Sequence, residues 1–109
     1  MTKETLQTYR ALKREVRQLD RLMRSPEAEA TVRGKTIGSL YKAKRDRLAA
    51  TQKQIEDAID ALDITERVIL RAKYIEGRSW TAICQEVHYS RTSAIRIHDR
   101  ALKKLARKA

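Results

Sequence analysis

The sequence is poor in the residues that mark turns, disulfides and sheets. Its 109 residues include one cysteine, one proline, three glycines and no phenylalanine. A single cysteine excludes a disulfide within the chain, as is usual in a reducing cytoplasm. So few glycines and prolines leave little of the turn chemistry that a sheet requires. No apolar run reaches membrane-spanning length, and no secretion signal is visible. We therefore expect an all-α, soluble, cytoplasmic protein.

Basic residues clearly outnumber acidic residues in the sequence. Lysine and arginine number 25 against 14 acidic residues, which gives a formal net charge of +11. Residues 1–63 hold 14 basic and 10 acidic side chains, whereas residues 64–109 hold 11 and 4. The mixture in the first part is typical of a solvated helix face. The excess in the second part favours an anionic partner, and nucleic acid is the first expectation.

The N-terminal part predicts two long helices. Apolar residues recur at steps of three and four over residues 2–24 and again over 39–62, which is the helical period. Ser25-Pro26 ends the first helix, and residues 27–38 are expected to form a loop with one short helical turn. Neither helix can bury its apolar stripe alone. We expect a long helical hairpin over residues 1–62, or alternatively a coiled-coil dimer that uses the same stripe.

The C-terminal part, residues 63–109, predicts a three-helix domain. Asp63 with Glu66 three positions later resembles a capping box that starts a helix to Ile75. Ser79 can cap a short helix over residues 80–86, and Ser90 can cap the last helix after a turn at residues 87–89. The expected inward residues are Val68, Ile69, Ala72, Ile75, Trp80, Ile83, Cys84, Ala94, Ile97, Ala101 and Leu105.

Two short helices joined by a three-residue turn predict a helix-turn-helix between Ile64 and Leu105. Its second helix, residues 90–100, would enter the major groove of double-stranded DNA. The expected base-reading residues are Arg91, Thr92, Ile95 and Arg96. The expected contacts to the DNA backbone are Arg78, Ser79, Thr81, Ser90, Arg100, Lys103 and Lys104.

Catalytic and metal-binding patterns are missing from the sequence. Two histidines ten residues apart without a glutamate in metalloprotease spacing do not predict a hydrolase. Cys84 has no second cysteine or histidine pair to complete a metal site. We expect Trp80 in the core, His88 in the turn, and His98 on the solvated surface rather than at a phosphate. We therefore expect no enzyme activity, no metal and no cofactor.

The same C-terminal residues resemble region 4 of bacterial sigma factors, which reads the −35 promoter element. The resemblance covers Ile64–Leu70, Tyr74–Ile83, Ser90-Arg91 and Ile97–Leu105. The segment Tyr-Ile-Glu-Gly-x-Ser-Trp and the charged N-terminal helices are closer still to phage late-gene activators of the ArpU/RinA type. The resemblance implies that Arg91, Thr92, Ile95 and Arg96 contact bases. Thr92 and Ile95 replace the acidic and basic residues common in sigma factors, so the recognised sequence should differ.

The helix-turn-helix pattern predicts a sequence-specific DNA-binding regulator, and the resemblance implies a phage or prophage transcription activator that works with RNA polymerase in the cytoplasm of a bacterial host. The N-terminal helices would form a homodimer or contact the polymerase. One alternative is a phage DNA-packaging protein similar to a terminase small subunit. Those proteins usually carry the DNA-binding domain at the N-terminus, which ranks this alternative second. Another alternative is a helical adaptor that binds polymerase without DNA.

Overall fold

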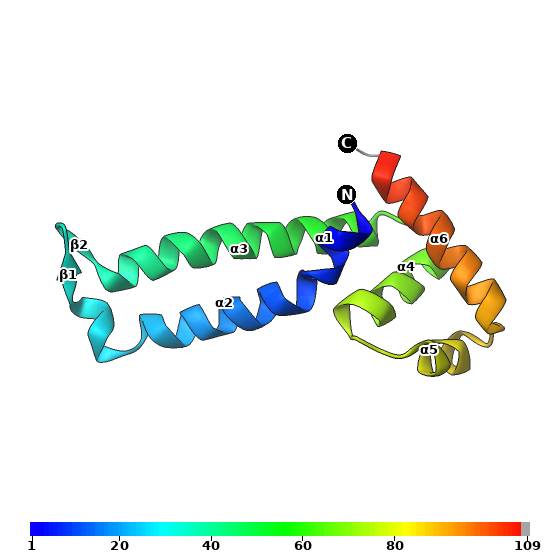
Figure 1. Cartoon of the computed structure of the whole chain (residues 1–109), viewed down its shortest axis with the longest axis horizontal. Helices are drawn as coiled ribbons and strands as arrows, with labels where there is room; N and C mark the ends of the chain where they lie inside the picture. The colour runs from blue at the N-terminus through cyan, green and yellow to red at the C-terminus, as the bar shows by residue number, and fades with distance from the viewer. Residues whose placement is uncertain (108–109) are drawn as a thin grey trace. The chain divides into compact units, whose positions relative to one another are not determined.

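The expected all-α fold is confirmed by a computed structural model, which describes residues 1–107 (Figure 1). The last two residues of the predicted C-terminal domain lie outside this range. Within it, no helix has both the length and the apolar character needed to cross a membrane. The elements in chain order are α1 (Lys3–Gln7), α2 (Tyr9–Met23), the 3₁₀ turn η1 (Pro26–Glu29), β1 (Thr31–Val32), β2 (Lys35–Thr36), α3 (Ile37–Asp60), α4 (Ile64–Leu70), the π-helical turn η2 (Arg71–Ile75), α5 (Trp80–Val87) and α6 (Arg91–Arg107).

The first predicted helix is divided in two at Thr8. The Thr8 hydroxyl donates to the backbone carbonyl of Thr5 at 2.6 Å, and its backbone N–H bonds the same carbonyl at 3.1 Å. Threonine side chains compete in this way with the regular helical ladder. The apolar period continues through the break because Leu6 and Tyr9 are both buried. Periodicity alone therefore could not reveal the interruption.

The segment between the long helices contains the expected helical turn and also a small hairpin. The turn η1 starts at Pro26, whose fixed φ suits the first helical position. Strands β1 and β2 then pair antiparallel, with Thr31 opposite Thr36. Arg33 and Gly34 join them with φ of 52° and 79°. Positive φ at both central residues matches the right-handed twist of a two-residue hairpin. The sequence analysis expected a loop here and missed the hairpin.

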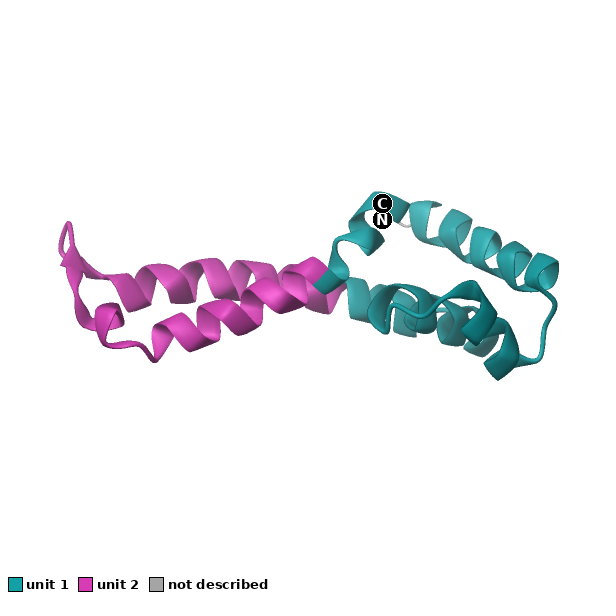
Figure 2. Ribbon diagram, turned by 60° about the horizontal axis from the view of Figure 1, so that its bottom comes forward, with its two compact units in different colours: residues 1–10, 55–109 teal, residues 11–54 magenta. Residues whose placement is uncertain are grey.

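The chain folds into two compact units, but they do not divide at residue 62 (Figure 2). Unit 1 comprises residues 1–10 and 55–109, and unit 2 comprises residues 11–54. Tyr9 belongs to unit 1 because its ring is 1% exposed and its hydroxyl donates to Glu56 Oε1. Ile55 and Ile59 are fully buried in the same unit. The predicted boundary followed the end of a helix. The packing instead assigns the start of α2 and the end of α3 to unit 1.

Unit 2 is a helical hairpin with a thin core. The two helices α2 and α3 lie side by side and run in opposite directions (Figures 1 and 2). Its buried side chains are Val16, Leu19 and Ala28. No residue of α3 between positions 37 and 54 is buried, and Leu40 is 45% exposed. The hairpin itself follows the prediction, but Tyr41 and Leu48 of its apolar stripe are only partly buried and Leu40 is exposed.

Unit 1 is built around a core that joins four helical segments. Ile69, Ala72, Ile83 and Ala94 form this core cluster, each at most 4% exposed. The sequence analysis placed these four correctly. Trp80, Cys84, Val87 and Ile97 pack against the cluster and are partly buried. Ala94 allows α5 and α6 to approach closely, because a larger side chain at this fully buried position would need space that the core does not offer.

The inward residues of the segment 64–75 differ from the prediction. Val68 is 37% exposed, and the buried residues include Glu66, Leu70 and Tyr74. Residues three and four positions after Glu66 share its helix face, which leaves Val68 on the other side. The π-helical turn η2, closed by the bond from Glu76 N to Arg71 O at 2.9 Å, then rotates the following residues. The prediction assumed one regular helix and missed this rotation.

Candidate nucleic-acid interface

The predicted caps of α5 and α6 are present, and the turn between the helices lies one residue later than the predicted residues 87–89. Three residues, His88 to Ser90, separate the two helices, and His88 adopts the left-handed conformation with φ of 61°. Ser79 Oγ accepts from Ala82 N at 3.2 Å, which confirms the first cap. Ser90 Oγ accepts from Ser93 N at 3.2 Å, which confirms the second. These hydroxyls satisfy N–H groups that a helix start would otherwise leave unpaired.

Three of the four predicted base-reading residues lie fully on the surface. Arg91, Thr92 and Arg96 are exposed, whereas Ile95 is partly buried. Among residues 1–107, no carboxylate forms an ion pair with Arg91 or Arg96. Because an unpaired exposed guanidinium keeps all its donors free, both arginines can bind an acceptor outside the chain.

The predicted backbone-contacting cations are mostly engaged within unit 1. Arg78 pairs with Glu86 and with Glu76, the latter at 3.3 Å. Arg100 lies 3.4 Å from Glu66, and the Lys104 ammonium lies 2.8 Å from the same carboxylate. Lys103 is exposed and has no ion pair within residues 1–107. Of the predicted set, it is therefore the cation most available to a phosphate.

Glu66 was interpreted as a cap residue, which is wrong. The Asp63 side chain makes no capping hydrogen bond, and the Glu66 side chain is completely buried. Its two oxygens accept from Lys104 and Arg100, while Asp63 accepts from Lys104 at 3.2 Å. These hydrogen bonds and nearby negative charges raise the pKa of Lys104. The ion pairs connect the start of α4 to α6 and so help to orient α6.

The expectation of a solvated His98 is also wrong. The residue is 5% exposed, and its ring lies edge-on to Trp80 at 5.2 Å between centroids. Its Nδ1 lies 3.0 Å from an Asp99 carboxylate oxygen, and its Nε2 lies 2.7 Å from the Tyr74 hydroxyl. Since a carboxylate only accepts, Nδ1–H donates to Asp99, and in the neutral ring Nε2 then accepts from the Tyr74 hydroxyl. The expected core position of Trp80 agrees with its packing here.

We expect unit 1 to lose stability above pH 10 through Tyr74. Burial raises the pKa of this phenol above its ordinary value of 10.0, and the negative charge of Asp99 adds to the effect. The folded state thus holds the proton more tightly than the unfolded chain, so this contribution is complete below pH 10 and falls as pH rises through the folded pKa. Urea unfolding at pH 9 and 11 measures the loss. Tyr74→Phe should show a smaller decrease, and an equal decrease would contradict the assignment.

Two exposed residues near the predicted site were missed by the sequence analysis. Gln85 lies with Trp80, Thr81, Cys84 and Arg91 around a surface depression of about 340 Å³. Its position four residues after Thr81 puts both on one helix face, a spacing that the sequence already contained. Asp99 has a 61% exposed side chain on α6, held by the buried ring of His98. The depression reaches the start of α6 through Arg91, which is part of its lining.

A comparison with known families gives one match. The family model described as protein of unknown function DUF722 matches residues 41–107. Comparisons with curated proteins and with solved structures find no significant match. The matched segment begins in α3 and continues through α6, and it covers more than half of the chain. The chain therefore belongs to the DUF722 family.

Proposed function

We propose that this protein is a sequence-specific double-stranded DNA-binding transcriptional regulator whose helix α6 enters the major groove. The proposal is carried by one observation. Arg91, Thr92 and Arg96 are exposed at the start of a helix that a three-residue turn and a buried Ala94 fix against α5. Arginine binds guanine through two parallel hydrogen bonds, and threonine hydrogen-bonds to several bases.

We further propose a phage or prophage activator that acts with RNA polymerase, on the basis of the resemblance to sigma region 4 and to ArpU/RinA activators. Dimerisation through the N-terminal helices is part of this proposal. The observation in its favour is Leu40, which is 45% exposed on α3 in a unit whose buried side chains are only Val16, Leu19 and Ala28 among the described residues. A dimer would bind two half-sites related by symmetry.

Paired substitutions on α6 test base recognition. Arg96→Ala should weaken binding to the preferred duplex by about 1–3 kcal/mol and relax the preference at one base position. Lys103→Ala should weaken all duplexes alike and reduce the slope of log K against log salt concentration by about 1. Fluorescence anisotropy over a salt series measures both. Similar behaviour of the two variants would contradict groove binding by α6.

The duplex for this test comes from selection of bound sequences from a random pool at physiological salt. An enriched motif is the expected result, and its symmetry reports the oligomeric state. If the wild-type chain enriches no sequence motif, sequence-specific binding is overturned.

A helical adaptor that binds RNA polymerase without DNA is the second candidate. The observation in its favour is an apolar pair on α4, where Ile64 is 68% and Val68 37% exposed one turn apart. Exposed apolar pairs of this kind occur at protein contacts, although two side chains form only a small patch. Polymerase binding without any salt-sensitive affinity for a duplex would favour the adaptor.

A further inference from the structure

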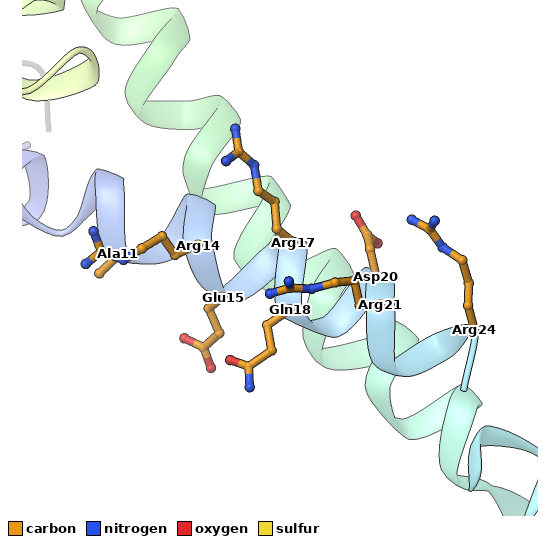
Figure 3. A pocket seen from close by; sticks show the side chains of 8 residues that line it. All are labelled: Ala11, Arg14, Glu15, Arg17, Gln18, Asp20, Arg21 and Arg24. Carbon is orange, nitrogen blue, oxygen red and sulfur yellow. The ribbon is translucent and has the colours of Figure 1, made fainter. Parts of the chain in front are cut away.

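The solvent face of α2 in unit 2 carries a row of arginines. We call Arg14, Arg17, Arg21 and Arg24 the arginine row. At 3.6 residues per turn, the three that lie in α2 (Arg14, Arg17 and Arg21) fall within an arc of about 60°, and Arg24 follows directly after the helix. All four are exposed, and Figure 3 shows Arg14, Arg17 and Arg21 extending from α2 and Arg24 from the turn that follows Met23. The row lies opposite the buried Val16 and Leu19, so it faces away from the hairpin core.

The acidic residues beside the row are already paired with α3. Glu15 Oε1 lies 3.2 Å from Lys44 Nζ, and Asp20 Oδ1 lies 3.0 Å from Arg45 Nε. No carboxylate among residues 1–107 forms an ion pair with a member of the row. The mixed composition of residues 1–63 suggested an ordinary solvated face, but the pairing across the hairpin leaves the arginines of α2 uncompensated.

A face built only for solubility would not need this arrangement. Like charges three and four residues apart repel each other and weaken a helix. The α3 surface shows the usual alternative, because Lys42 there bonds Asp46 one turn away at 3.3 Å. The arginine row keeps its repulsion, and an anionic ligand would relieve it. Arginine is also the cation that binds phosphate oxygens through two hydrogen bonds at once.

We propose that the arginine row is a second DNA-binding surface, which holds the phosphate backbone of a duplex without reading its sequence. Arg14 to Arg24 extend over about 15 Å at 1.5 Å per residue. That length of duplex axis carries about four phosphates on one strand at 3.4 Å each. This inference rests on the proposed DNA binding, since both surfaces take the same ligand. The row would raise the affinity and the salt dependence for every sequence.

Two matched triple variants of the full chain test the row. Arg14→Gln/Arg17→Gln/Arg21→Gln removes three of its charges, whereas Arg33→Gln/Lys35→Gln/Arg47→Gln removes three exposed charges elsewhere in unit 2. Glutamine retains helix propensity, and far-ultraviolet circular dichroism checks the fold.

The probe is a 30-base-pair duplex of random sequence, titrated over a salt series. The row variant should lower the slope of log K against log salt by about 2.5–3. The control should lower it by less than half as much.

Equal slopes for the two triple variants would overturn the proposal, because bulk charge would then explain the binding. If the row variant binds the duplex as the wild type does but loses binding to polyglutamate, the proposal is overturned in favour of an acidic protein partner. Arg91→Gln/Arg96→Gln separates the two proposals. If that variant keeps the wild-type sequence preference while the row variant loses slope, base reading by α6 fails and the row stands. If Arg91→Gln/Arg96→Gln loses the sequence preference while the row variant keeps the wild-type slope, the row proposal fails and base reading by α6 stands.

Discussion

Replacing Ile83 with alanine should lower the free energy of unfolding of unit 1 by about 3–4 kcal/mol. Ile83 is fully buried between Ile69, Ala72 and Ala94 in the core cluster. Truncation removes three carbons and leaves a cavity, because the helices around it are held by their own packing and cannot close the space. Trp80 packs against the same cluster and is the only tryptophan, so its fluorescence during urea unfolding reports on this unit.

The chain offers a matched control for this substitution. Ile64→Ala removes the same atoms from a side chain that is 68% exposed, and it should change the free energy of unfolding by no more than about 0.5 kcal/mol. Ile83→Ala should also weaken duplex binding, because α5 positions the first turn of α6. Equal destabilisation by the two variants would mean that Ile83 is not in the core that the structure shows.

The apolar period of the sequence predicted the helices and most of this core. Ile69, Ala72, Ile83 and Ala94 lie at helical spacings, and each is buried. Ser79 and Ser90 cap the helices as predicted, because an N-terminal cap depends on residues within three positions of it. The hairpin of α2 and α3 follows from the same rule, since each helix carries one apolar stripe.

The errors concern polar residues whose partners are far away in the sequence. Glu66 was assigned to a local cap, but it is buried against Lys104, 38 residues later. His98 was assigned to the surface, but it is enclosed by Trp80 and by Tyr74, 24 residues earlier. A histidine or glutamate on a helix can be buried whenever another element supplies a hydrogen-bond partner. Periodicity gives no information about such a partner.

The prediction of which cations contact the DNA backbone also required knowledge of partners that lie far away in the sequence. Arg78 and Lys104 looked equivalent to Lys103 in the sequence, because all three are basic and close to α5 or α6. The structure gives the first two carboxylate partners and leaves Lys103 without one among residues 1–107. Charge counts therefore overestimate the number of cations that are free to bind a phosphate.

Substitutions of Glu66 should also change the free energy of unfolding strongly, by an amount that depends on the side chain that replaces the carboxylate. Glu66→Ala should lower the free energy of unfolding by about 3 kcal/mol, because it removes two charge-assisted hydrogen bonds and opens a cavity at a position with no exposed surface. Glu66→Gln keeps the volume but loses the charge, and it should cost about 2 kcal/mol. Urea unfolding followed by Trp80 fluorescence measures both.

Glu66→Leu is the informative control because it fills the space without a charge. The side chains of Lys104 and Arg100 are 41% and 60% exposed, so both cations can turn to water when the carboxylate is absent. A buried ion pair often contributes little beyond what a well-packed apolar residue supplies, because burying the carboxylate has a desolvation cost. The leucine variant should therefore stay within about 1 kcal/mol of the wild type. A loss as large as that of Glu66→Ala would show that the ion pairs, rather than the packing, hold α4 against α6.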